Sequence, residues 1–217
     1  MTDIKTFVQD TRYKLHSDGR FINKTKDRFE QHPLSVATMS EQDHALKRQF
    51  SQWMSQYDAL RPERIPYNSG QPVAIPGKVE VECYDYGYPG STYHDTTEGN
   101  SGKGFYRSDD VDIVSKRGRH RVTNTDAGEW LEYSVDMKQA GTHMLSVSYA
   151  GTQAGIIRFE CSGQTLIDSI ALKPTGAMDR YESVSVGDVR LEAGRQVLRL
   201  HIKQGGMQLD HFTIGAN

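Results

Sequence analysis

Cysteine is scarce in this chain of 217 residues, which contains only Cys83 and Cys161. Two cysteines so far apart exclude a zinc ribbon and a dense disulfide framework. The sequence leaves open whether they pair, and two free, half-buried thiols are the simpler interpretation.

Long apolar runs and an excess of one charge are also missing. No run approaches the ~20 residues of a membrane helix, and the start, Met1 to Lys5, lacks the apolar region of a signal peptide. A formal net charge of −2 gives no basic surface for nucleic acid or an anionic membrane. The composition, 36% hydrophobic and 25% charged, is that of an ordinary globular protein with much exposed loop.

The first sixty residues predict a small α+β subdomain. Residues 13–16 and 20–23 flank Ser17-Asp18-Gly19, which predicts a β-hairpin with glycine at positive φ. A capping box at 40–43 then precedes a helix of about five turns that ends before Pro62. Its apolar stripe is Leu46, Phe50, Trp53, Met54, Tyr57 and Leu60. One hairpin covers too little of this stripe, so the subdomain looks incomplete.

Residues 61–77 contain Pro62, Pro66, Pro72 and Pro76 and predict a stiff, extended linker lying along a surface. From residue 78 to 217, short alternating segments separated by Gly-containing turns predict an antiparallel β-sandwich. These segments are 79–82, 129–137, 143–149, 156–161, 181–186, 196–203 and 208–214. The longest gap, 87–119, is a candidate functional loop.

Five blocks of the sandwich region, in order, resemble a carbohydrate-binding module of family 6. They are Glu80 to Asp85, Tyr93 to Asp95, Tyr106 to Ile113, Gly128 to Tyr133 and Met207 to Phe212. The resemblance covers nearly all of residues 77–217. It implies a mainly β protein with a jelly-roll β-sandwich that binds polysaccharide without catalysis and carries a structural calcium ion.

Glu80 and Glu82 are two residues apart on an expected strand, so both carboxylates should point to one face. Calcium prefers several such oxygen ligands. The resemblance implies that these two residues, Asp210 on the last strand and a backbone carbonyl near Arg107 hold the ion. The alternative is a pair of solvent-facing glutamates on an edge strand.

The resemblance also implies a sugar-binding cleft at the loop end of the sandwich. In such a cleft two aromatic rings stack on the apolar faces of a sugar, and an amide binds its hydroxyls. The aromatic positions correspond to Asn124 and Met178 and the amide position to Gln208. Both aromatic residues are therefore replaced.

Three interpretations of this replacement stay open. The first is that residues of the long loop enter the cleft instead: Tyr93, Tyr106, Tyr88, His94, Asp95 and Asp112. The second is binding on the concave face of a sheet, and the third is loss of sugar binding, with the sandwich packing on a neighbouring domain. The resemblance makes Trp130 part of the fold signature, so we expect it to pack rather than to bind.

Residues 10–62 resemble the C-terminal subdomain of a type I sulfatase. The matching segments are Thr11 to Leu15, Ser17 to Phe21, Asp27 to Glu30 and Pro33-Leu34, while Ile22-Asn23 and Arg28 depart from the usual pattern. The resemblance implies that an upstream catalytic domain covers the helix. Its nucleophile motif, Cys/Ser-x-Pro-x-Arg, does not occur at Cys83 or Cys161, so we expect no sulfatase activity from this chain.

Other catalytic patterns, such as HExxH or a nucleophile elbow, are missing. Paired carboxylates such as Asp109 and Asp110, or Asp95 and Glu98, are more often solvated on a loop than catalytic.

The 93–95 and 106–113 blocks are also similar to modules on enzymes of algal galactans. The predicted function is a polysaccharide-binding module that holds an attached sulfatase on a sulfated, agar- or carrageenan-like galactan of marine origin. The parent protein would be extracellular or periplasmic. The alternatives are a structural sandwich that packs on its catalytic domain and a glycan-cleaving enzyme.

Overall fold

A computed structural model describes residues 7–16, 19–60, 64–104 and 106–216. The chain divides into two compact units, residues 3–62 and 63–217. Within the described residues, no helix combines the length and apolar character needed to cross a membrane.

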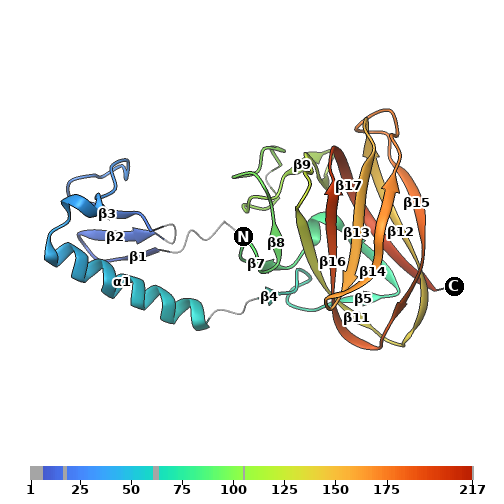
Figure 1. The fold of residues 1–217 in the computed structure, drawn as a ribbon, viewed down its shortest axis with the longest axis horizontal. Coiled ribbons are helices and arrows are strands. Elements are labelled where there is room, and N and C mark those ends of the chain that lie inside the picture. Colours follow the sequence, from blue (N-terminus) through green and yellow to red (C-terminus); the bar gives the residue numbers. More distant parts are fainter. Residues whose placement is uncertain (1–6, 17–18, 61–63, 105, 217) are drawn as a thin grey trace. The chain divides into compact units, whose positions relative to one another are not determined.

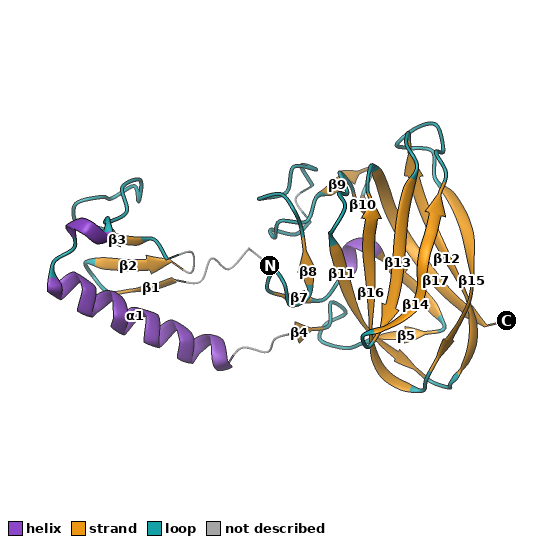
Figure 2. Ribbon diagram, in the orientation of Figure 1, coloured by secondary structure: helices purple, strands orange, loops and turns teal. Residues whose placement is uncertain are grey.

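The N-terminal unit packs one helix on a small antiparallel sheet with strand order β1-β2-β3 (Figure 2). Its elements are β1 Phe7–Gln9, β2 Tyr13–His16, β3 Phe21–Asn23, the 3-10 helix η1 Val36–Thr38 and α1 Glu41–Leu60. The predicted hairpin is confirmed as β2 and β3, although Ser17 and Asp18 of its turn lie outside the described residues. Strand β1 was not predicted.

The capping box of α1 is also confirmed, as is the packing of Leu46, Phe50 and Met54 from its apolar stripe. Asp43 N donates to Ser40 Oγ at 3.2 Å, and Ser40 N donates back to Asp43 Oδ2 at 3.0 Å. Phe50 is buried with Leu15 and Phe21, whereas Trp53 is 46% exposed. The side chains of the last two stripe positions, Tyr57 and Leu60, lie outside the described set.

The C-terminal unit is a sandwich of two six-stranded sheets (Figure 1). The β17 sheet has the order β15-β12-β17-β10-β9, with β6 paired to β17. Its strands are β6 Gly77–Glu80, β9 Ile113–Lys116, β10 Arg119–Val122, β12 Gly141–Gly151, β15 Glu182–Leu191 and β17 Met207–Ala216.

The β16 sheet has the order β14-β13-β16-β11-β5, with β8 paired to β11. Its strands are β5 Val73–Ile75, β8 Tyr93–His94, β11 Trp130–Met137, β13 Gly155–Cys161, β14 Gln164–Leu172 and β16 Gly194–Gln204. A small pair, β4 Arg64–Ile65 with β7 Tyr86–Gly87, and the 3-10 helix η2 Val81–Cys83 complete the unit.

The inner faces of both sheets supply one continuous buried cluster. Phe212 of β17 lies edge-on to Tyr133 of β11 and Phe159 of β13, with ring centroids 5.2 and 5.1 Å apart. Such aromatic pairs contribute about 0.5–1.5 kcal/mol beyond burial. The predicted sandwich is thereby confirmed, and alternation along each strand leaves the other side chains on the two outer faces.

Two predicted features of this unit require correction. The segment expected to be a linker contributes β4 and β5, and β5 pairs in parallel with β11, so residues 64–77 belong to the sandwich. Glu80 and Glu82 do not share a strand, because β6 ends at Glu80 and η2 follows. Cys83 and Cys161 are free thiols, as the simpler interpretation predicted.

Strand β17 contains a β-bulge at Asp210. In its pairing with β12, His211 lies opposite Ser148 and Leu209 opposite Tyr149, so Asp210 is the additional residue. Leu209 and Phe212 are buried, and Asp210 and His211 between them are only partly covered. The bulge thus places two adjacent polar side chains on the outer face.

Candidate functional site

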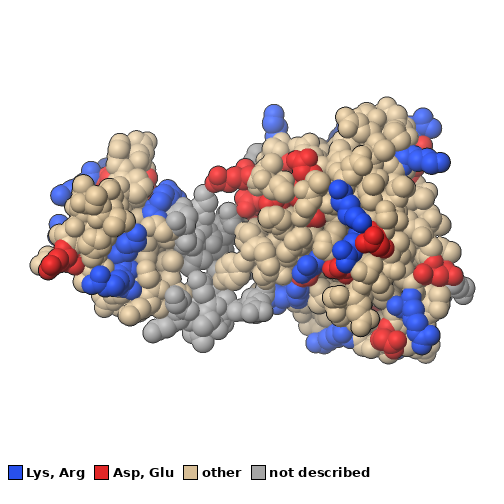
Figure 3. All heavy atoms as spheres, viewed as in Figure 1, with Lys and Arg blue, Asp and Glu red and all other residues tan. Residues whose placement is uncertain are grey.

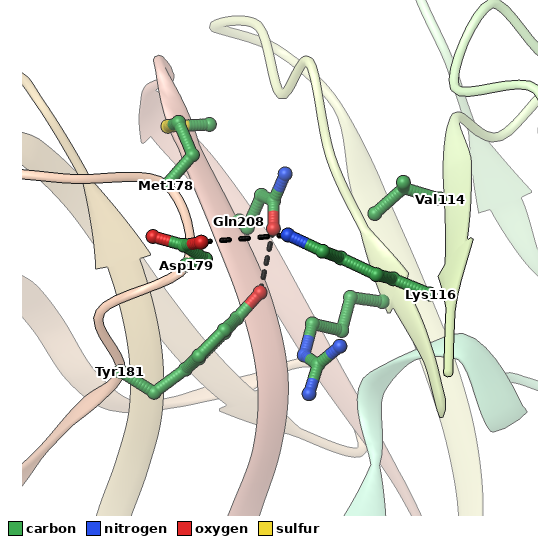
Figure 4. Close-up of a pocket in the computed structure, with 7 residues that line it drawn as sticks. Val114, Lys116, Met178, Asp179, Tyr181 and Gln208 are labelled. Carbon is green, nitrogen blue, oxygen red and sulfur yellow. Dashed lines mark hydrogen bonds and ion pairs between the residues drawn. The ribbon is translucent and has the colours of Figure 1, made fainter. Parts of the chain in front are cut away.

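A pocket of about 390 Å³ lies on the outer face of the β17 sheet, where β9, β10 and β17 meet the loop before β15 (Figure 4). Its lining residues are Val114, Lys116, Arg121, Met178, Asp179, Tyr181 and Gln208. Val114 lies directly opposite Arg121 in the β9–β10 pair, and β10 pairs with β17 next to Gln208. Strand alternation therefore brings these side chains to one face.

The loop that carries Met178 and Tyr181 is anchored at Thr175. Thr175 is 3% exposed, its backbone N donates to Gly151 O at 2.8 Å, and its Oγ1 accepts from Gly151 N at 3.0 Å. These bonds attach the loop to the end of β12. The pocket wall is thus anchored by a buried residue, Thr175, that does not itself line the pocket.

Gly205, just before β17, allows a close approach of two backbones. A Cβ atom at Gly205 would lie 1.7 Å from Thr125 O, which no other residue could tolerate. Gly206 N donates to the same oxygen at 2.8 Å, and Thr125 Oγ1 donates to Met207 O at 3.1 Å. This junction sets the start of β17, and with it the position of Gln208.

Tyr181 supplies an aromatic ring to the pocket. Its hydroxyl donates to Gln208 Oε1 at 2.5 Å, and the Arg121 guanidinium lies 4.3 Å from its ring centroid. Burial raises the pKa of Tyr181 to about 12, so the hydroxyl remains a donor at neutral pH. The bond leaves the amide nitrogen of Gln208 pointing away from Tyr181 (Figure 4).

Charged side chains lie on two sides of the pocket. Arg121 is 8% exposed, and its Nε lies 2.8 Å from Asp210 Oδ1, although its N–H is not directed at that oxygen. Lys116 Nζ lies 3.4 Å from Asp179 Oδ2, and both side chains are exposed. The pocket therefore combines a ring, apolar surface from Met178, an amide and two cations.

The structure brings together two of the three predicted cleft residues. Met178 and Gln208 both line the pocket, whereas Asn124 does not. Asn124 adopts a positive φ of 49° and donates from Nδ2 to Ser101 Oγ at 3.1 Å. Tyr181 was not predicted to be a site residue, although its place three residues after Met178 could have indicated it.

The candidates from the long loop lie elsewhere. Tyr93 is 1% exposed, with its ring 5.6 Å from Tyr84, so it offers no surface to a sugar. Asp112 is 2% exposed and accepts from Ser101 N and Oγ. The expectation that these two residues contact a ligand is wrong because the loop folds them inward, where they hold it together.

Three further loop candidates have partners within the sandwich. Asp95 accepts from Thr97 N and Oγ1, both at 2.9 Å, and burial raises its pKa. The Tyr106 ring stacks on His120 at 3.9 Å and its hydroxyl bonds Tyr67. His94 is exposed beside Trp130, with ring centroids 6.5 Å apart. None of the three lines the pocket.

The predicted calcium ligands Glu80, Glu82 and Asp210 lie close enough to interact. Burial raises the pKa of Glu82 to about 7, and the charges of Glu80 and Asp210 add to the effect. Glu82 is 6% exposed, and its Oε2 has no hydrogen-bond partner. An orphaned, buried carboxylate oxygen is a donor of the kind that calcium prefers.

The other two carboxylates are engaged by cations. Lys78 Nζ lies 2.5 Å from Glu80 Oε1, and Asp210 contacts Arg121 and His211 at 2.8 Å each. Among the described residues, no group of three or more His, Cys, Asp or Glu side chains is gathered closely enough to hold a metal ion. The donor types suit calcium, but Glu80 and Asp210 would have to give up these cation partners to bind it.

Arg107, near which a backbone ligand was expected, is a buried packing residue. Its Nη1 donates to Tyr84 O at 2.6 Å, and its guanidinium lies 3.6 Å from the Tyr84 ring centroid. The side chain also pairs with Asp109 at 2.9 Å. Arg107 thus joins the long loop to the segment after η2.

The outer face of the β16 sheet carries a charge network. Glu132 pairs with Arg64 and with Arg199, whose guanidinium lies 4.1 Å from the Trp130 ring centroid. Charges of both signs alternate over this face, while acidic side chains gather over the loops near β8 and β9 (Figure 3). Because Glu132 already pairs with both arginines, a ligand on the outer face of the β16 sheet would have to displace these ion pairs.

The fold agrees with comparisons to known proteins. The family described as carbohydrate binding module (family 35) matches residues 107–214. A search of curated proteins found no match.

Three solved structures illustrate the similarity. A family 6 module from Clostridium stercorarium in complex with cellobiose has 18% identity and a TM-score of 0.51, covering 68% of this chain and 99% of its own. Another family 6 module, studied by binding sub-site dissection, has 13% identity and a TM-score of 0.50, covering 67% and 98%. The module of Cellvibrio mixtus lichenase 5A with cellotriose has 21% identity and a TM-score of 0.49, covering 66% and 98%. The sandwich thus has the fold of carbohydrate-binding modules, and most of it matches the family 35 model.

Proposed function

We propose that the sandwich binds a polysaccharide in the pocket between β9, β10, β17 and the loop before β15. The observation that carries the proposal is the convergence of Tyr181, Met178 and Gln208 on one open cavity. A ring and a thioether give apolar surface for a sugar face, and an amide orients its hydroxyls. Tyr181 takes the part expected of the replaced aromatic residues.

Affinity electrophoresis in gels that contain agarose, carrageenan, ulvan or xylan tests the proposal. The protein should be retarded in at least one gel, and Tyr181→Ala should remove most of the retardation. An aromatic platform contributes roughly 1–3 kcal/mol to ligand binding, or about fivefold to 150-fold in affinity. If the wild type migrates in each of these gels as fast as in a gel without polysaccharide, polysaccharide binding is refuted.

We further propose that the polymer is a sulfated, algal galactan-like polysaccharide and that the module holds an attached sulfatase on it. Such tethering raises the effective concentration of substrate without new chemistry. The resemblance of residues 10–62 to a sulfatase subdomain supports the proposal, as does the exposed apolar surface of that unit at Phe29 and Trp53, which are 79% and 46% exposed. The parent protein would act outside the cytoplasm, where such polymers occur.

We also propose a structural calcium ion between Glu80, Glu82 and Asp210. The ion would neutralise three interacting carboxylates, of which Glu82 has the orphaned oxygen. Bound there, it would join β6 to β17 at the bulge.

A further inference from the structure

Lys116 and Asp179 face each other across the pocket (Figure 4). Lys116 comes from the end of β9 and Asp179 from the loop before β15, and their charged atoms lie 3.4 Å apart. Their side chains are 59% and 72% exposed. An exposed ion pair of this kind contributes only about 0–1 kcal/mol, so either residue can exchange its partner at little cost.

The other cation of the pocket is not available in this way. Arg121 is 8% exposed, lies against the Tyr181 ring and has Asp210 at 2.8 Å. Releasing a mostly buried pair would leave an uncompensated charge, which is strongly unfavourable. Lys116 is therefore the cation in this pocket that a ligand can take over.

The neighbouring groups suit a charged substituent on a sugar. Lys116 and Gln208 both line the pocket, and the amide nitrogen of Gln208 points away from Tyr181 (Figure 4). The Lys116 ammonium and the Gln208 amide thus give the pocket two kinds of N–H donor for an oxyanion. The Asp179 carboxylate shows that an anion fits against Lys116.

We propose that the pocket recognises an anionic substituent of the polysaccharide, a sulfate ester or a carboxylate, which replaces Asp179 as the partner of Lys116. Asp179 then acts as a built-in competitor that lowers affinity for every anionic ligand. This inference rests on the proposed polysaccharide binding at the same pocket. It adds the residue that would select an anionic substituent, Lys116, and the residue that would compete with it, Asp179.

The test compares four variants of the full chain in gels of agarose, which is neutral, carrageenan, which is sulfated, and polygalacturonate, which carries carboxylates. Lys116→Gln should weaken binding to the preferred anionic polymer about tenfold and weaken binding to agarose by much less. Asp179→Asn should strengthen binding to the same polymer about threefold. Added salt should weaken wild-type binding to that polymer more than binding of Lys116→Gln.

Two matched controls make the same charge changes elsewhere. They are Asp136→Asn, at the end of β11, and Lys138→Gln, in the turn before β12. Both positions are exposed and lie at the opposite end of β12 from Gly151 and the pocket. Both should bind like the wild type. A gain of affinity in Asp179→Asn cannot come from misfolding, so this variant keeps the test decisive if Lys116→Gln is unstable.

The outcomes separate the two proposals. If the wild type binds a polymer and Lys116→Gln and Asp179→Asn behave like their controls, the anionic substituent is refuted and polysaccharide binding stands. If the wild type prefers agarose, the same conclusion follows. If it binds none of the polymers, both proposals fail. Preference for carrageenan would identify the substituent as a sulfate ester, and preference for polygalacturonate would identify it as a carboxylate.

Discussion

Arg121 Nε lies 2.8 Å from Asp210 Oδ1, and this contact joins the pocket to the predicted calcium ligands. On one side the Arg121 guanidinium supports the Tyr181 ring. On the other side Asp210 interacts with Glu82, whose pKa its charge raises. A substitution of Arg121 or Asp210 should therefore change both the free energy of unfolding and the affinity of the pocket for its ligand.

Arg121→Met should lower the free energy of unfolding by about 3 kcal/mol, because it leaves the mostly buried Asp210 carboxylate without its cation. Chemical denaturation of the chelator-treated protein measures this. Replacing both Arg121 and Asp210 by Met should cost less than the sum of the single changes, since the two residues interact directly.

Arg190→Met is the matched control for this cycle, because Arg190 is 80% exposed and pairs only at 3.7 Å with Glu192. It should change stability by less than ~0.5 kcal/mol. Strictly additive costs at Arg121 and Asp210 would show that the observed contact contributes no coupling.

Calcium should stabilise the sandwich if the proposed site forms. A ligand that binds only the native state adds about 2.7 kcal/mol when present at a hundred times its Kd. The melting temperature of chelator-treated protein should therefore rise on addition of calcium. Glu82→Gln should lose this rise, whereas Glu192→Gln, whose side chain is 73% exposed, should keep it. An unchanged melting temperature in the wild type would exclude the ion.

Glu129 should make stability depend on pH. Burial, with the nearby charge of Asp95, raises the pKa of Glu129 above its ordinary value of 4.5. In this case the unfolded chain releases its proton first, so stability falls as pH rises from the ordinary value through the raised pKa. Glu129→Gln removes this loss while keeping an acceptor for Thr96, whose Oγ1 donates at 2.9 Å.

The two proteins should accordingly melt alike at acidic pH and diverge as the pH rises, with Glu129→Gln the more stable. Thermal melting over this range, with Glu192→Gln as an exposed control, gives the comparison. A constant difference between wild type and variant at every pH would contradict the linkage.

Trp130→Ala separates the pocket from the outer face of the β16 sheet as the sugar-binding surface. It removes the ring that lies 4.1 Å from the Arg199 guanidinium, so the melting temperature should fall by a few degrees. Retardation in the polysaccharide gels should be unchanged, because Trp130 does not line the pocket. Lost retardation with an intact fold would move the binding site to the β16 sheet.

Ser40→Ala should weaken the start of α1 by about 1 kcal/mol, because it removes the acceptor for Asp43 N. Hydrogen exchange of the first-turn amides in the full chain reports this change. Ser51→Ala is the control in the same helix, since Ser51 Oγ only donates back to Lys47 O. Equal exchange rates in the two variants would mean that the cap does not stabilise the helix.

The long strands of the sandwich were predictable because their alternation is regular. In β11, for example, Leu131, Tyr133 and Val135 are buried together and Asp136 is exposed. Edge strands were missed where alternation is weak: β14 buries only Ile170 and Leu172 among its nine residues. Strand β5 was missed because its three residues lie between prolines and depend on pairing with β11.

The candidate site was only partly predictable, because burial is a tertiary property. Tyr93 looked like a ligand platform in a polar loop, yet β8 pairs with β11 and carries it into the core. Glu82 looked like a strand residue, yet η2 turns its carboxylate inward. Lys116 and Asp179 are 63 positions apart, so no local pattern could have brought them together.

Asp210 is the additional residue that β17 accommodates opposite β12. Without Asp210 the strand would alternate plainly, with Leu209 and Phe212 facing inward and His211 as the one outward residue between them. Deleting Asp210 would therefore keep Gln208 and Phe212 on their present faces. Deleting a residue of β17 outside the bulge would instead exchange the inner and outer sides on one flank of the deletion.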